Sequence, residues 1–231
     1  MLYIKRSKTY GFCEAATGMR LSYRRQEPHS LEDLYHYVNA IGDPENHYTL
    51  SSDDFLLMMK LVQKSDSESK FMRFIVSYLT VEAPLYWWKQ FDQYKIGCST
   101  LSESTMHTIT KRNLSVNDLS ALTFAREPTN NKSDIGVNYL KLEKTVVAQI
   151  NKMIDSFNKS HDPEEREMLF NAIIGILPSS YMQTRMITAS YQTLRHIYRD
   201  RKDHKLNEWR LFCDFLEKYM PYSALITVER N

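Results

Sequence analysis

Residues 97 to 107 gather side chains that bind anions and carry protons. The segment reads Gly-Cys-Ser-Thr-Leu-Ser-Glu-Ser-Thr-Met-His, so hydroxyl groups dominate it, and it also holds the thiol of Cys98 and the imidazole of His107. Hydroxyl groups donate hydrogen bonds to phosphate oxygens and to the edge of a pyrimidine. The segment therefore predicts a turn that binds a phosphorylated heterocycle, although a hydroxyl-rich turn can also serve only to cap a helix.

A thiol and an imidazole in one segment also raise the question of thiolate catalysis. The separation of Cys98 from His107 in the sequence gives no reason to expect contact, and an isolated cysteine is usually packed and inert. We therefore expect Cys98 not to be a nucleophile.

Three further groups of side chains could bind a ligand. The planar guanidinium of Arg73 suits a phosphate, but the carboxylates of Asp66 and Glu68 are alternative partners. The Trp87-Trp88 pair suits a flat ring such as an isoalloxazine or a purine, although aromatic residues on a short helix more often belong to the core.

The third group stands near the C-terminus. Arg201, His204 and Glu208 follow one another at helical spacing, so a cation, an imidazole and a carboxylate can share one side of a helix. A solvated basic face with helix ion pairs is the alternative.

The pattern of apolar residues predicts the elements that hold these side chains. Helical spacing, caps and prolines predict helices over 31–41, from 55 onward, over 85–94, 137–157, 164–176 and 206–219. A β-branched and aromatic run predicts a buried strand over 71–81, and residues 2–23 predict a short strand followed by an irregular segment. Polar residues around Pro128 predict an exposed loop over 126–136 that could act as a lid. We expect an α+β fold in one domain over residues 1–231, with a small central, mostly antiparallel sheet flanked by long helices.

Composition argues against several classes of protein. The net charge is +2, from 30 Lys and Arg against 28 Asp and Glu, which does not support a general nucleic-acid or membrane binder. Three scattered cysteines predict neither a disulfide framework nor a zinc site, and they fit a reducing cytoplasm. No apolar run approaches the ~20 residues that cross a bilayer. With 6 glycines and no Gly-rich loop, the chain would have to bind a phosphate or a flavin through side chains and helix ends.

Four segments between residues 15 and 220 are similar to the flavin-dependent thymidylate synthases. Residues 64–76 resemble the family's turn and strand with Lys-His-Gly-His-Glu, and residues 83–91 resemble its Ala-Pro, aromatic and Arg-Gln-Trp residues. Residues 177–185 resemble the segment before the last active-site helix. The segment from 193 to 221 resembles that helix with its Asn-Leu-Arg and His-Ala-Gln-x-Glu-Ile pattern, in which Arg201 is kept.

The defining motif of that family is rewritten in this chain. Gln93, Tyr94 and Lys95 stand where the family has Arg-His-Arg, Cys98 replaces the first motif serine, Ser104 keeps the second, and Met106 and His107 occupy the Arg-Tyr positions. The loss of two arginines removes permanent cations whose charge-assisted hydrogen bonds each contribute about 1.5–3 kcal/mol. Lys95, Arg73 and His107 are the residues that could partly compensate.

The resemblance implies a methyl transfer to a pyrimidine nucleotide, dUMP or a related uridylate. In the family, reduced FAD passes a hydride and methylenetetrahydrofolate gives the carbon, with NADPH as a further co-substrate. The resemblance also implies a homotetramer with its sites at subunit interfaces. Its implied catalytic residue is Arg201, which contacts the pyrimidine. The implied substrate-binding residues are Lys95, Cys98, Ser99, Ser102, Ser104, Thr105 and Arg201, and the implied cofactor-binding residues are Arg73, Gln93, Tyr94, Lys95, His107 and His204.

Two other functions stay open. Because the motif is eroded, the chain is alternatively a catalytically inactive nucleotide- or flavin-binding homologue, or an interaction protein of the same fold. The basic run from Arg195 to Lys205 is the one feature that supports an RNA- or DNA-modifying enzyme. We expect no bound metal, no membrane partner and a cytoplasmic location.

Overall fold

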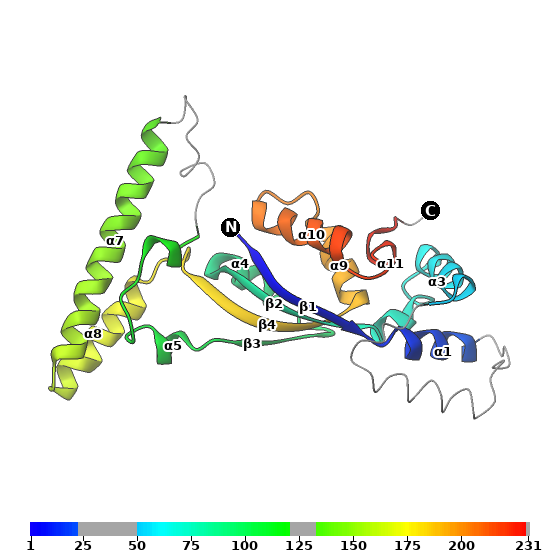
Figure 1. Cartoon of the computed structure of the whole chain (residues 1–231), viewed down its shortest axis with the longest axis horizontal. Coiled ribbons are helices and arrows are strands. Elements are labelled where there is room, and N and C mark those ends of the chain that lie inside the picture. Colours follow the sequence, from blue (N-terminus) through cyan, green and yellow to red (C-terminus); the bar gives the residue numbers. More distant parts are fainter. Residues whose placement is uncertain (23–49, 121–132, 230–231) are drawn as a thin grey trace. The chain divides into compact units, whose positions relative to one another are not determined.

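The structure, a computed structural model, describes residues 1–22, 50–120 and 133–229. Figure 1 traces its strands, β1 (Tyr3–Tyr10), β2 (Val76–Pro84), β3 (Cys98–Ser102) and β4 (Met182–Ser190). Its helices are α1 (Phe12–Ser22), α3 (Ser52–Lys64), α4 (Leu85–Phe91), α5 (Thr105–Thr108), α7 (Ser133–Lys159), α8 (Pro163–Ile176), α9 (Tyr191–Arg201), α10 (Asn207–Tyr219) and α11 (Ala224–Thr227), with short 3-10 turns η1 (Lys70–Arg73) and η2 (Val116–Asp118). Within the described ranges, no helix has the length and apolar character needed to cross a membrane.

The four strands form one sheet in the order β1-β2-β4-β3. Leu85 N, just after β2, donates to Tyr181 O, just before β4, at 3.0 Å, and Tyr191 N, just after β4, donates to Ile75 O, just before β2, at 2.9 Å. These bonds join the end of each strand to the start of the other, so β2 and β4 are antiparallel. The predicted α+β class with a small antiparallel sheet and many helices is confirmed.

The contacts that residues make in space divide the chain into two compact units. Unit 1 comprises residues 1–6, 80–93 and 100–186, and unit 2 comprises residues 7–79, 94–99 and 187–231. Each strand of the sheet contributes residues to both units. The single domain over 1–231 stays a prediction, and the two units are described one at a time.

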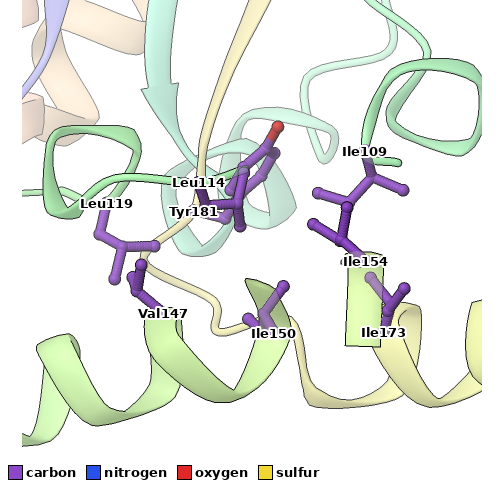
Figure 2. Packing of buried hydrophobic residues seen from close by; sticks show 8 residues of the cluster. All are labelled: Ile109, Leu114, Leu119, Val147, Ile150, Ile154, Ile173 and Tyr181. Carbon is purple, nitrogen blue, oxygen red and sulfur yellow. The ribbon is translucent and has the colours of Figure 1, made fainter. Parts of the chain in front are cut away.

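The core of unit 1 lies on helices α7 and α8. Val147, Ile150 and Ile154 recur at three- and four-residue spacing on one side of α7, which is the pattern of a helix with one buried face. They form a cluster with Ile173 of α8 (Figure 2), whose other members are Ile109, Leu114, Leu119 and Tyr181. Burying each aliphatic side chain contributes roughly 1.5–3 kcal/mol. The helices predicted over 137–157 and 164–176 are confirmed as α7 and α8, and their buried faces form this core.

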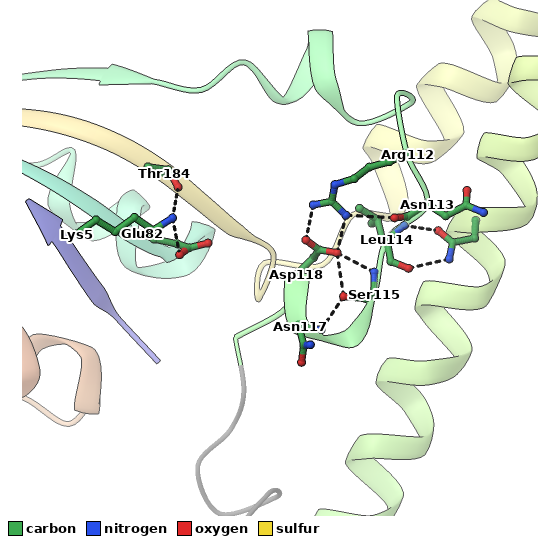
Figure 3. Close-up of polar contacts among 10 residues, drawn as sticks. Lys5, Glu82, Arg112, Asn113, Leu114, Ser115, Asn117, Asp118 and Thr184 are labelled. Carbon is green, nitrogen blue, oxygen red and sulfur yellow. Dashed lines mark hydrogen bonds and ion pairs between the residues drawn. The ribbon is translucent and has the colours of Figure 1, made fainter.

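A polar cluster holds the loop before η2 on helix α7 (Figure 3). Arg112 pairs with Asp118 through two hydrogen bonds, and its guanidinium lowers the pKa of the Asp118 carboxyl. Asn151 of α7 accepts from Leu114 N at 2.7 Å and donates to Leu114 O at 2.9 Å. Both polar groups of the Leu114 backbone are therefore satisfied where the loop meets the core.

The core of unit 2 lies on helices α9, α10 and α11. Tyr191, Leu194 and Ile197 of α9 are buried, as are Trp209 and Phe212 of α10. Arg195 is 1% exposed, and its Nη1 donates to the carbonyl oxygens of Leu225 at 3.2 Å and Ile226 at 3.3 Å. A cation from the basic run 195–205 thus holds α11 rather than facing solvent.

The N-terminal segment differs from its prediction. Residues 12–22 form the helix α1, whereas the sequence predicted an irregular segment. Phe12, Ala15, Ala16 and Met19 are buried at helical spacing, so tertiary packing outweighs the weak local signal. The break between β1 and α1 falls at Gly11, whose φ is +93°; a Cβ there would lie 2.0 Å from Phe74 O.

The hydroxyl-rich segment is also not a simple turn. Residues 98–102 form β3, an edge strand, and residues 105–108 form one turn of helix. Strand pairing supplies the reason: Ser190 N donates to Gly97 O at 2.9 Å and Glu103 N donates to Thr184 O at 3.0 Å. Polar side chains on both faces suit an exposed edge strand, and they conceal its period in the sequence.

Two other predicted boundaries shift. The strand predicted over 71–81 begins only at Val76, because residues 70–73 close a 3-10 turn. The helix predicted over 85–94 ends at Phe91. Residues 133–136 of the predicted loop belong to α7, while its remainder, 126–132, and the predicted helix over 31–41 lie outside the described residues.

Gly97 packs closely against the start of helix α9. Its φ is +67°, and a Cβ at this position would lie 2.6 Å from Thr193 Oγ1 and 3.0 Å from Ser190 Oγ. Thr193 Oγ1 donates to Ile96 O at 2.9 Å, and Ser190 Oγ accepts from Thr193 N at 3.2 Å as the cap of α9. We call Gly97, Ser190 and Thr193 the Gly97 clamp. The clamp fixes the backbone of residues 96–97 to the start of the helix that carries Arg201.

The clamp predicts a specific cost for a methyl group at position 97. Gly97→Ala places a side chain in a left-handed conformation and against two hydroxyl groups, so we expect it to lower the free energy of unfolding by about 1–3 kcal/mol. Chemical denaturation followed by circular dichroism measures this change.

The matched control is Gly18→Ala, since a Cβ at Gly18 meets nothing within 4 Å and the residue lies in helix α1. The control should be neutral or stabilising by up to about 1 kcal/mol. Equal stability of the two variants would contradict the clamp.

Candidate functional site

Arg201 ends helix α9 among aromatic side chains of unit 2. Its guanidinium carbon lies 4.8 Å from the centre of the Trp209 ring and 5.6 Å from the centre of the Tyr94 ring. The two rings meet edge to face, with centroids 6.0 Å apart. A guanidinium at such distances is attracted to the ring face, and the contact restricts how the side chain can turn.

Tyr94 binds Arg201 directly. Arg201 Nε donates to Tyr94 Oη at 2.8 Å, and Tyr94 Oη donates to Asp200 Oδ2 over a longer 3.5 Å. Burial raises the pKa of the Tyr94 phenol, the nearby Asp200 raises it further, and Arg201 acts in the opposite direction. The phenol therefore stays neutral near pH 7, where it can accept one hydrogen bond and donate another.

His204 stands one turn beyond the end of α9. Its ring lies 6.3 Å from the Trp209 ring, and its Nδ1 accepts from Leu206 N at 3.1 Å. Burial lowers the pKa of His204, and the cations Arg201, Lys205 and Arg210 lower it further. The imidazole is therefore neutral at pH 7. We call Tyr94, Asp200, Arg201, His204 and Trp209 the Arg201 cluster.

The sequence-predicted residues of unit 2 divide between this cluster and its surroundings. Tyr94, Arg201 and His204 come together in the cluster, and Lys95 follows Tyr94 as an exposed cation. Arg73 lies on η1, where its Nε donates to Gln192 Oε1 at 2.6 Å. Among the described residues, neither carboxylate proposed as an alternative is its partner: Glu68 pairs with Lys64 at 3.0 Å, and Asp66 lies 3.8 Å from His196 Nε2.

Cys98 and Ser99 are the two remaining predicted residues of unit 2. They open strand β3, where Cys98 is half-buried and Ser99 is exposed. Their roles as substrate-binding residues stay predictions.

The remaining predicted residues belong to unit 1. Thr105 Oγ1 accepts from Gln183 Nε2 at 3.1 Å, and the same amide donates to Glu103 O at 3.2 Å. Gln93 Nε2 donates back to Lys89 O at 3.4 Å. Exposed side chains complete this group, namely Ser102, Ser104 and His107. A joint site made from both sets of residues stays a prediction.

The tryptophan pair is part of the core. Trp87 and Trp88 are each 0% exposed, and Trp87 stacks on Phe91 with ring centres 5.1 Å apart. Trp88 Nε1 donates to Gln183 O at 3.0 Å, and Arg185 covers the Trp88 ring at 4.5 Å. The core interpretation of these aromatics is confirmed, and a flat ligand has no access to them.

A pocket of about 380 Å³ lies elsewhere in unit 1. Apolar side chains such as Leu119, Leu142 and Val146 form much of its wall, together with Tyr86 and Glu143. None of the residues that line this pocket is a sequence-predicted site residue. The pocket therefore gives no support to the predicted nucleotide site.

Sequence reasoning missed the aromatic partner of Arg201. Trp209 lies in the helix predicted over 206–219; it is buried, and its ring supports the guanidinium. Asp200 and Gln192 were not singled out either, although both bond to predicted residues. The available signal was position: Trp209 stands eight residues after Arg201, on the next helix, beyond a short turn.

No family model matches the sequence, and no curated protein matches it either. Solved structures do match its fold. Thymidylate Synthase X (ThyX) from Helicobacter pylori, with FAD and dUMP, has a TM-score of 0.61 at 13% identity, and the match covers 97% of this chain and 94% of that one. A second structure of the flavin-dependent enzyme from Helicobacter pylori, complexed with FAD and dUMP, has a TM-score of 0.59 at 10% identity, covering 97% and 95%.

The UMP/dUMP methylase PolB from Streptomyces cacaoi, bound with 5-Br dUMP, has a TM-score of 0.58 at 10% identity, and the match covers 98% of this chain and 93% of that one. Nearly the whole of each chain takes part in these matches, while the identities are too low to carry an activity across. The resemblance predicted from four short segments is thus confirmed at the level of the fold: this chain has the fold of the flavin-dependent thymidylate synthases.

Proposed function

We propose that this protein binds a pyrimidine nucleotide and, with reduced FAD, transfers a methyl group to it. The observation that carries the proposal is the Arg201 cluster, in which a cation predicted to contact the pyrimidine is held at a fixed orientation by Tyr94 and Trp209. The fold supports it, because two similar structures hold FAD and dUMP and a third holds 5-Br dUMP.

The proposed roles follow the sequence predictions. Arg201 contacts the pyrimidine, and further substrate contacts come from Lys95, Cys98, Ser99, Ser102, Ser104 and Thr105. The residues proposed to hold FAD are Arg73, Gln93, Tyr94, Lys95, His107 and His204. We further propose methylenetetrahydrofolate and NADPH as co-substrates, a homotetramer with interface sites, and a cytoplasmic location.

The donors of the chain fit an anionic cofactor. Arg73 is exposed on η1 and uses its Nε for Gln192, so its terminal nitrogens are placed to donate to phosphate oxygens. Lys95 adds a second exposed cation in the same unit. When bound, FAD would supply the hydride. The side chains would bind the nucleotide, orient its ring and neutralise its phosphate, and no protein nucleophile is needed.

A catalytically inactive nucleotide-binding protein is the second candidate. Two positions where the resembling family has arginine are Gln93 and Met106 here, and neither supplies a cation. The side-chain amide of Gln93 donates to Lys89 O, and the side chain of Met106 is 55% exposed. A nucleotide site that lacks these two cations would bind its ligand without turnover.

Binding is tested on the purified full-length protein. We expect a flavin absorbance spectrum after incubation with FAD and removal of the excess, and a rise in melting temperature with dUMP. A ligand at 100 times its dissociation constant stabilises the folded state by about 2.7 kcal/mol. Absence of both signals would reject the proposed function.

Turnover separates the two candidates. If the proposed enzyme is correct, formation of a methylated pyrimidine should depend on NADPH, FAD and methylenetetrahydrofolate together. Binding of dUMP without product under these conditions would favour the inactive homologue.

Substitution of Arg201 tests the residue that carries the proposal. Arg201→Lys keeps the positive charge but loses the planar, forked donor, so we expect the dissociation constant for dUMP to rise about 10- to 100-fold. Isothermal titration calorimetry measures it. Arg199→Lys is the matched control, because Arg199 is an exposed arginine on the same helix, and it should bind like the parent protein. An equal loss in both variants would remove Arg201 from the site.

The protonation of His204 gives a prediction in pH. Because burial and three cations lower its pKa, the imidazole should titrate below its ordinary value of 6.5 in an NMR titration. The unfolded chain then binds this proton more readily, so the contribution of His204 to stability is complete above about pH 6.5 and is lost as the pH falls toward the folded pKa. Lys205→Met removes one of the cations and should raise the pKa. A midpoint at or above 6.5 in the parent protein would contradict this electrostatic environment.

A further inference from the structure

Arg201 is restrained from two directions. Its Nε donates to Tyr94 Oη at 2.8 Å, and its guanidinium lies 4.8 Å from the centre of the Trp209 ring. The hydrogen bond fixes one edge of the guanidinium plane, and the ring limits its tilt. The remaining orientational freedom of the group is therefore small.

Tyr94 is itself held in place. Its hydroxyl donates to Asp200, its ring meets the edge of Trp209, and the chain three residues later enters the Gly97 clamp. The clamp bonds Ile96 O to Thr193 of helix α9 and Gly97 O to Ser190, the residue that caps this helix. Tyr94 and Arg201, far apart in sequence, thus belong to one rigid arrangement within unit 2.

The bond to Tyr94 leaves the outer edge of Arg201 for a ligand. Among the described residues none accepts a hydrogen bond from Arg201 Nη1 or Nη2, and the side chain is half-buried rather than fully enclosed. Two parallel N–H groups on a planar fork match two neighbouring acceptors, such as those on a pyrimidine edge or a phosphate.

We propose that Tyr94 is a positioning residue, whose phenol holds Arg201 so that its outer edge is ready for a pair of acceptors on the nucleotide. This inference rests on the proposed function and adds a role for the phenol that stands where the resembling family has histidine. Tyr94 acts through Arg201, because its oxygen accepts from Arg201 Nε while its hydroxyl donates to Asp200.

The size of the effect follows from conformational freedom. Without the phenol oxygen, Arg201 regains rotamers that must be frozen again when the ligand binds. Immobilising one such side chain changes the dissociation constant by about three- to tenfold. Tyr94→Phe removes the oxygen and keeps the ring against Trp209, so the cation–ring contacts are retained.

Tyr198→Phe is the matched control. Tyr198 is a half-buried tyrosine on α9 whose hydroxyl donates to Glu217 at 3.2 Å, and it lies outside the Arg201 cluster. Tyr198→Phe loses the bond to Glu217, and Tyr94→Phe loses the bonds to Arg201 and Asp200, so both variants lose phenol hydrogen bonds to side chains at the same helix. A merely structural effect would therefore appear in both.

The first measurement needs no ligand. In an ¹⁵N–¹H NMR spectrum of the full-length protein, the Nε–Hε signal of Arg201 is identified by its absence in Arg201→Lys. We expect it to be distinct and slow to exchange with water in the parent protein and in Tyr198→Phe, and to move to the solvent-exposed position in Tyr94→Phe. An unchanged Arg201 signal in Tyr94→Phe would overturn the proposal.

The second measurement is a double-mutant cycle on binding. Tyr94→Phe should weaken dUMP binding about three- to tenfold in the parent protein and leave it unchanged in an Arg201→Met background, because methionine has no N–H group for Tyr94 to hold. Equal losses in both backgrounds would overturn the proposal.

Uridine and inorganic phosphate identify which acceptors Arg201 meets. If Tyr94→Phe weakens the binding of uridine and leaves the binding of phosphate unchanged, Arg201 contacts the edge of the base. If it weakens only the binding of phosphate, Arg201 contacts the phosphate. If Tyr94→Phe binds dUMP, uridine and phosphate as tightly as the parent protein does, the positioning role is rejected. Failure of the parent protein to bind any of them rejects the proposed function instead, while the Arg201 signal still decides whether Tyr94 holds the guanidinium.

Discussion

The close approach of Gly97 to helix α9 is the constraint on which the candidate site depends. A side chain at this position would meet Thr193 Oγ1 and Ser190 Oγ, so the hydrogen bonds from α9 to the 96–97 backbone exist only because the residue is glycine. The Ser190 hydroxyl also accepts from Thr193 N and so caps the start of α9. The backbone two residues after Tyr94 is thus bonded to the start of the helix that ends in Arg201.

From this constraint the chemistry of the Arg201 cluster follows. Arg201 is a cation beside two aromatic rings, and the neutral phenol and the neutral His204 add no charge. The carboxylate of Asp200 accepts from the phenol rather than from the guanidinium. Trp209 is buried and supports the guanidinium, so what the cluster offers to a ligand is one oriented positive group, which suits acceptors on a nucleotide. Because Gln93 and Met106 stand where the resembling family has arginines, we expect Arg201 to supply a larger share of the nucleotide binding.

Local signals in the sequence were enough for several elements. Ser51 accepts from Asp54 N as a cap, and Asp162 with Pro163 opens α8, because caps and first-turn prolines act within a few residues. Strand β3 and helix α1 were missed since strand pairing and burial are decided by distant residues. Arg201 and Tyr94 were both named as site residues, but their hydrogen bond joins positions 107 residues apart and no local pattern encodes it.

A crystal structure of the protein with dUMP tests the central claim most directly. We expect electron density for the nucleotide with two of its acceptors within about 3 Å of Arg201 Nη1 and Nη2, while Arg201 Nε still donates to Tyr94. Nucleotide density at another place in the molecule, with the outer edge of Arg201 facing solvent, would contradict it.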